Sequence, residues 1–165
     1  MLDKPVFKEM YQVGLVVKDC YASVKKYADE YGIGPWTFYV FDPKTMKDMV
    51  IHGKPENYAM RLAVAKIGNV EIELIEPLDD KSVYVEFLKK HGEGLHHVLF
   101  GVEDYSKTLD FFKGKGMGVL MGANWHGVKF SYIDSQKELG LIAEIFEPPP
   151  GFEFPKPDDV YPKGK

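Results

Sequence analysis

Residues 70–77 read VEIELIEP, and residues 141–148 read LIAEIFEP. In both segments a glutamate stands in the middle of an apolar strand, three residues before a second glutamate and a proline. Removing a carboxylate from water is unfavourable unless a cation or hydrogen bonds compensate. Two such residues in the same local frame, Glu73 and Glu144, therefore indicate a pair with a shared role.

The same correspondence occurs at the start of each half of the chain. YQVGLVVKD (11–19) aligns with HHVLFGVED (96–104), so that Gln12 falls on His97 and Asp19 on Asp104. Agreement at both ends of each half, in the same order, predicts a degenerate tandem repeat.

Each half has the same predicted order of elements, namely a strand, a helix and three strands. The first half has strands at 13–17, 36–41, 58–67 and 70–77 and a helix at 20–31; the second has strands at 95–102, 118–123, 128–134 and 141–146 and a helix at about 105–115. We predict one α+β domain over residues 1–150, with two βαβββ modules (about 9–78 and 95–148) and a linker helix at 81–92. Asp19 is suited to cap the first helix, and Gly68-Asn69 to form a hairpin turn.

Two segments lie outside this repeat. Residues 42–57 are polar and long for a connection, which is typical of a lid or binding loop. Residues 148–165 hold six of the eleven prolines. Because proline cannot donate a backbone hydrogen bond, we predict that the tail, 151–165, is an extended arm lying on this subunit or a neighbour.

The composition narrows the classes of partner. The 165 residues carry a formal net charge of −4, and Arg61 is the only arginine, so a nucleic acid partner is not expected. No stretch has the length of a membrane span or a signal peptide, so we expect a cytoplasmic protein with a small-molecule substrate, and we expect a homodimer. Cys20 has no cysteine partner in the chain and is expected to pack at the start of a helix.

The repeat places four polar residues at related positions: Gln12, Glu73, His97 and Glu144. Three oxygen donors and one imidazole nitrogen suit a divalent cation of intermediate hardness, and two carboxylates balance its charge. We therefore predict one divalent ion per site, Co²⁺, Ni²⁺, Mn²⁺ or Zn²⁺, bound by these four residues. Neighbouring side chains on a strand point to opposite faces, so His96 is expected to face outward or to lie behind the ligands.

The sequence resembles the vicinal oxygen chelate superfamily over roughly residues 9–150. This superfamily includes glyoxalase I, methylmalonyl-CoA epimerase, extradiol dioxygenases and bleomycin-resistance proteins. The segments YQVGLVVKD, VEIELIEPLDDKS, HGEGLHHVLFGVED and LGLIAEIFEPP are most similar to the epimerase branch. The resemblance implies a cupped mixed sheet and places the four metal positions of the family on the same four residues.

The chain departs from each branch that it resembles. The epimerase branch usually has histidine at the position of Gln12 and glutamine at that of Glu73, and its separate glutamate base has no clear match within residues 58–67. The ligand set is instead that of glyoxalase I. The glutathione-binding positions of that branch fall on Val16, Pro77 and Glu93, which do not suit an anionic substrate.

Both branches remove a proton next to a carbonyl, so the resemblance implies a metal-dependent epimerase or racemase with Glu73 and Glu144 as the acid/base pair. The substrate is expected to be a CoA thioester such as methylmalonyl-CoA, or a bulky aromatic ketone such as an isoflavanone. The alternatives are a glyoxalase I-like lyase, a drug-binding resistance protein without activity, or a structural metal site. An iron dioxygenase would need histidine at Gln12.

Bulky side chains are the candidates for the substrate pocket, although many of them are expected to be core residues. They are Trp36, Phe38, Met60, Met117, Met121, Trp125, Phe130 and Tyr132.

Overall fold

The structure is a computed structural model that describes residues 4–164. Its strands are β1 (Glu9–Val16), β2 (Trp36–Phe41), β3 (Met46–Ile51), β4 (Lys54–Pro55), β5 (Met60–Ile67), β6 (Val70–Pro77), β7 (Gly94–Gly101), β8 (Val119–Trp125), β9 (Val128–Ile133), β10 (Ile142–Glu147) and β11 (Asp159–Tyr161). Its helices are α1 (Cys20–Tyr31), α2 (Val83–His91), α3 (Tyr105–Gly114) and α4 (Gln136–Leu139).

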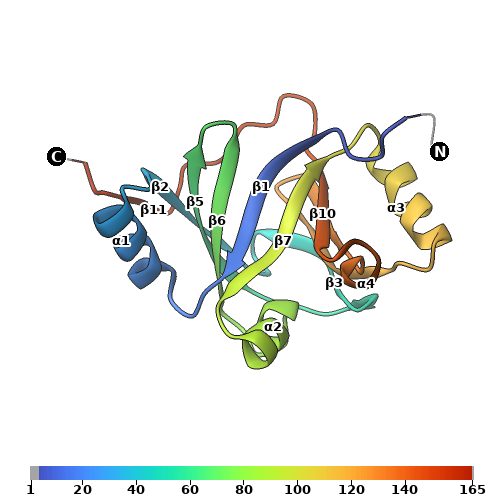
Figure 1. The fold of residues 1–165 in the computed structure, drawn as a ribbon, viewed down its shortest axis with the longest axis horizontal. Helices are drawn as coiled ribbons and strands as arrows, with labels where there is room; N and C mark the ends of the chain where they lie inside the picture. Colours follow the sequence, from blue (N-terminus) through green and yellow to red (C-terminus); the bar gives the residue numbers. More distant parts are fainter. Residues whose placement is uncertain (1–3, 165) are drawn as a thin grey trace.

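The strands form one sheet in the order β11-β2-β5-β6-β1-β7-β10-β9-β8-β3-β4 (Figure 1). The halves β2-β5-β6-β1 and β7-β10-β9-β8 are mirrored about the antiparallel pair of β1 and β7. In each half the first and last strands run parallel, with Gly14 opposite Glu73 and Leu99 opposite Glu144. The register therefore follows the sequence repeat, and the predicted fold class is confirmed.

The helices flank this sheet (Figure 1). Helix α1 begins where the Asp19 side chain accepts a hydrogen bond from the Ala22 N–H, and α3 begins in the same way at Asp104. Cys20 is fully buried at the start of α1 as predicted, and burial raises the pKa of its thiol.

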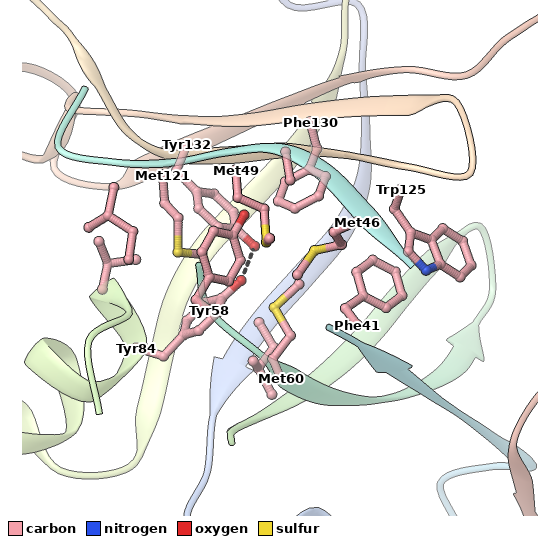
Figure 2. Close-up of a cluster of buried hydrophobic side chains, with 14 of the residues drawn as sticks. Phe41, Met46, Met49, Tyr58, Met60, Tyr84, Met121, Trp125, Phe130 and Tyr132 are labelled. Carbon is pink, nitrogen blue, oxygen red and sulfur yellow. Dashed lines mark hydrogen bonds between the residues drawn. The ribbon is translucent and has the colours of Figure 1, made fainter. Parts of the chain in front are cut away.

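A core of methionine and aromatic side chains lies between the two halves (Figure 2). Met46, Met49, Met60 and Met121 come from three strands, β3, β5 and β8, and pack around Tyr58, Tyr84 and Tyr132. The hydroxyl groups of Tyr84 and Tyr132 are 2.7 Å apart and form a buried hydrogen bond.

The prediction of a long loop at 42–57 is wrong, because this segment contains β3 and β4. Met46, Met49 and Ile51 are buried, whereas Lys47 and Asp48 are exposed. Strand β3 pairs with β8 of the other half, so its hydrogen-bond partner lies far away in the sequence.

The tail leaves β10, crosses one edge of the cup and ends beside β2 on the far side (Figure 1). There β11 pairs antiparallel with β2. The tail thus lies on its own subunit in an extended form. Among residues 4–164, no helix is long and apolar enough to cross a membrane.

Candidate active site

The four central strands β6, β1, β7 and β10 bring the predicted ligands together. His97 Nε2 lies 2.9 Å from Glu144 Oε2 and 3.5 Å from Glu73 Oε2. All three side chains are buried, and so is Gln12, whose amide Nε2 donates to Glu71 Oε2 at 3.3 Å. That bond leaves the amide oxygen of Gln12 free for another partner.

Gly14 leaves room for the side chain of His97. The two residues are opposite each other across the β1–β7 pair, and a methyl group on Gly14 would overlap the imidazole ring of His97. Only glycine therefore allows the ring to lie flat on the neighbouring strand.

Gly14→Ala is expected to force this ring out of place and to lower stability by about 1–3 kcal/mol, the usual range for overpacking. We expect weaker binding of divalent ions by the same variant. Urea unfolding and metal titration measure both effects. The control is Gly118→Ala, since a methyl group there meets nothing within 4 Å. Equal behaviour of the two variants would contradict this account of Gly14.

The neighbouring histidine supports His97 from behind. His96 is 4% exposed and packs against Tyr84, Phe87 and Tyr132. Of the two positions expected for this side chain, it therefore takes the one behind the predicted ligands and does not face outward. Its Nδ1 lies 3.2 Å from His97 Nδ1. If His97 donates through Nδ1, its Nε2 presents a lone pair to the site, which is the arrangement found for metal-binding histidines.

Burial dominates the electrostatics of the site. Burial raises the pKa of Glu144 to about 8. Burial and the charges of Glu144 and Glu71 raise the pKa of Glu73 well above its usual range. Burial also lowers the pKa of His97 to about 3, so this imidazole is neutral and cannot balance the carboxylates.

The donor set fits a divalent ion. Although His97 Nε2 and Glu144 Oε2 are 2.9 Å apart, neither atom has a hydrogen-bond partner, because the contact is not aligned as a donor–acceptor pair. Two atoms that bind one ion at roughly 2.1 Å lie about 3 Å apart when they occupy adjacent octahedral positions. Within residues 4–164, no group of three or more His, Cys, Asp or Glu side chains is arranged so that it could hold a metal ion by itself. The ion therefore belongs to the proposal below, with Gln12 as a further donor.

A cavity of about 650 Å³ opens above this cluster, with Gln12, Glu73 and Glu144 in its lining. Both halves of the sheet contribute to its wall, so the sheet curves around it. Its other lining residues are largely aromatic or aliphatic and include Tyr39, Phe41, Leu62, Val64, Leu99, Val128 and Phe146. The carboxylates therefore face an apolar chamber.

Half of the predicted pocket residues line this cavity: Met60, Trp125, Phe130 and Tyr132. The prediction is wrong for Trp36 and Phe38, whose side chains pack on the opposite face of β2, near α1. Strand alternation explains the error, because Thr37, Tyr39 and Phe41 take the cavity side instead. Met121 is fully buried in the core behind the wall (Figure 2), and Met117 packs in the cluster around α3.

Three lining features were not predicted from the sequence. Glu71 lines the cavity two residues before Glu73 and holds the amide of Gln12. The alternation of β6 was the available signal, since residues 71 and 73 share one face. Phe152 and Phe154 come from the tail, for which no pattern in the sequence indicated a position.

The fold and the site define a protein with a small-molecule chamber between two repeated modules. The chain belongs to the Glyoxalase/Bleomycin resistance protein/Dioxygenase superfamily, whose model matches residues 11–132. The predicted resemblance is thereby confirmed at the level of the superfamily.

Three relatives show how wide this similarity is. The uncharacterized protein YqjC of Bacillus subtilis is 33% identical over 98 residues, which are 56% of this chain and 69% of YqjC. The 4-hydroxyphenylpyruvate dioxygenase of Legionella pneumophila is 31% identical over 133 residues, 67% of this chain and only 38% of the dioxygenase. The ethylmalonyl-CoA/methylmalonyl-CoA epimerase of Cereibacter sphaeroides is 31% identical over 86 residues, 48% of this chain and 63% of the epimerase.

Solved structures agree on the fold. The crystal structure of methylmalonyl-CoA epimerase from Mycobacterium tuberculosis superposes with a TM-score of 0.64 at 21% identity, covering 91% of this chain and 94% of that chain. The similarity supports the arrangement of two modules around a central site.

Proposed function

We propose that this protein is a metal-dependent epimerase that inverts a carbon centre next to a carbonyl group. The observation that carries the proposal is the pair of buried carboxylates, Glu73 and Glu144, at equivalent register positions of the two halves. Two relatives described as epimerases of CoA thioesters support the same class.

Gln12, Glu73, His97 and Glu144 are the residues that would hold the divalent ion. When bound, the ion acts as a Lewis acid that stabilises negative charge on a carbonyl oxygen.

The proton transfer is assigned to the two glutamates. One carboxylate takes the proton from the α carbon, and the electron pair of the C–H bond moves into the adjacent carbonyl to give an enolate. The other glutamate, in its protonated form, returns a proton to the opposite face of the same carbon, which inverts it.

The apolar wall of the chamber contributes to the reaction by excluding water and orienting the substrate. It limits the access of water to the enolate, and it orients a substrate through shape rather than through charge. The substrate candidates remain a CoA thioester, which the names of two relatives support, and a bulky aromatic ketone, which the lining supports. The glyoxalase I-like alternative has the ligand set in its favour, but Val16, Pro77 and Glu93 are absent from the lining of the cavity.

Deuterium exchange tests the proposal. Incubation of the metal-loaded protein in D₂O with methylmalonyl-CoA, or with an aryl ketone that has a stereogenic α C–H, is expected to place deuterium on the α carbon and to racemise it. NMR detects the label, and EDTA is expected to abolish the reaction. Absence of exchange in both substrate classes, with metal bound, would contradict an epimerase function.

A further inference from the structure

The C-terminal tail forms part of the chamber wall. Pro148, Pro149, Gly151, Phe152 and Phe154 all line the cavity. These residues lie beyond the segment that matches the superfamily, which ends at residue 132. The tail is therefore a feature that the family model does not account for.

The tail completes an aromatic cluster. Phe152 and Phe154 are 5.2 Å apart between ring centroids, and each lies 6.2 Å from the ring of Trp125. Phe154 is also 6.1 Å from Tyr39, on the other half of the sheet. Trp125 and Tyr39 are themselves 5.8 Å apart, so the four rings form one cluster where the two halves of the sheet meet, although Phe154 is still 68% exposed.

The tail is anchored on the far side of the mouth. The Asp158 N–H donates to the Phe38 carbonyl at 2.9 Å, and the Asp158 carboxylate accepts from the Val40 N–H at 2.7 Å. Beyond it, β11 pairs with β2, and the Tyr161 hydroxyl donates to Asp29 at 2.8 Å. With both ends of the crossing fixed, Phe152 and Phe154 are held over the chamber.

Charge limits what the chamber accepts. Among the described residues, Lys66 is the only cation in the lining, and it lies in register with Glu71, which also lines the cavity. Arg61 is directed to the opposite face, where its guanidinium binds Glu76 at 2.8 Å. Three carboxylates, Glu71, Glu73 and Glu144, line the chamber beside this one lysine, so the lining offers no cluster of cations to hold an anionic group.

We propose that the tail is the specificity-determining wall of the substrate site, and that it selects substrates whose part beyond the reacting carbonyl is uncharged and aromatic. This group packs against the surface of the cluster that Phe152, Phe154, Trp125 and Tyr39 present to the chamber. The proposal rests on the proposed function for the position of the reacting carbon, whereas the binding preference can be measured separately.

The test uses the uncharged fluorescent probe N-phenyl-1-naphthylamine, which needs no catalytic turnover. The wild-type protein is expected to bind it, and acetophenone is expected to displace it at lower concentration than coenzyme A. Phe152→Ala combined with Phe154→Ala is expected to raise the Kd of the probe roughly tenfold or more, because two aromatic contacts with the probe are lost.

Two further variants make the result specific. Asp158→Ala leaves the lining intact and removes one anchor, so it is expected to weaken probe binding in the same direction. Phe111→Ala, on α3 and outside the chamber, is the matched control and is expected to bind as the wild type does. Circular dichroism checks that each variant is folded.

Three results would overturn the proposal: no probe binding by the wild type, unchanged binding by the folded double variant, or stronger displacement by coenzyme A than by acetophenone. Loss of deuterium exchange with intact probe binding would count against the proposed function and would leave this inference standing.

Discussion

Replacing Glu73 or Glu144 with glutamine is expected to abolish racemisation while the divalent ion stays bound. Glutamine keeps an oxygen ligand of the same length but removes the basic oxygen. Loss of a general base lowers rates by about 10²–10⁴-fold. Racemisation of each pure enantiomer, followed by polarimetry, together with metal analysis, measures both properties.

The two variants are also expected to differ from each other. In each of them the remaining carboxylate still serves one face of the substrate, so deuterium exchange should continue for a single enantiomer, and the favoured enantiomer should switch between the variants. The matched control is Glu86→Gln, because Glu86 is exposed on α2 and does not line the cavity.

Full activity of both glutamine variants, with metal bound, would disprove the two-base mechanism. His52 lies in the exposed turn between β3 and β4, with its Nε2 2.9 Å from Glu86 Oε1. It is absent from the cavity lining, so His52→Ala is expected to retain activity.

Metal-free protein is expected to lose stability as the pH rises from about 6.5 to 8. The pKa of Glu144 is raised to about 8, and that of Glu73 is also raised. In the unfolded chain a glutamate has its ordinary pKa near 4.5, so above this pH the folded state retains protons that the unfolded state has lost. Stability falls wherever the native state binds more protons than the unfolded state.

The histidines act in the opposite direction. The pKa values of His96 and His97 are lowered to about 2 and about 3. Below the ordinary histidine pKa of 6.5, the unfolded state therefore binds protons on these residues while the folded state does not. Between pH 4.5 and 6.5 the protons that the unfolded state gains on the two histidines nearly balance those that the folded state keeps on the two glutamates, so stability changes little. Below this window the unfolded state binds more protons than the folded state, and stability falls as the pH is lowered. Above it only the glutamates contribute, so stability is expected to fall as the pH rises toward 8.

Urea unfolding after EDTA treatment, at pH values from 5 to 9, measures this loss. Adding Co²⁺ or Zn²⁺ is expected to restore stability most strongly near pH 8, because the ion displaces the protons from the carboxyl groups. His97→Ala is expected to lose this rescue and to keep the decline above pH 6.5. A metal-free stability that is flat or increases from pH 6.5 to 8 would contradict the electrostatic description of the site.

The repeat explains why so much of the candidate site could be predicted. Because equivalent strands in the two halves share one register, matching Gln12 with His97 and Glu73 with Glu144 was enough to place four side chains at one centre. Helix α1 was also predictable, since its cap at Asp19 and its stop at Gly32 are local signals.

Other parts of the site depend on contacts between distant segments. Strand β2 reads WTFYVF, which is apolar on both faces, so the sequence does not say whether Phe38 or Tyr39 faces the chamber. That choice is fixed by packing against α1 and β5. Strand β3 is polar on one face and forms because β8 offers an unpaired edge, and the tail is positioned by its pairing with β2.

The two ends of the sheet have a consequence for self-association. Both outermost strands come from outside the repeated strand sets: β4 is two residues long and contains Pro55, and β11 is three residues long and is followed by Pro162. Short edges with proline offer few free backbone groups for a strand of another molecule. Copies of the chain are thus discouraged from joining edge to edge into a continuous sheet. The homodimer expected from the sequence would therefore need a contact surface made of side chains, on the helices or on the faces of the sheet.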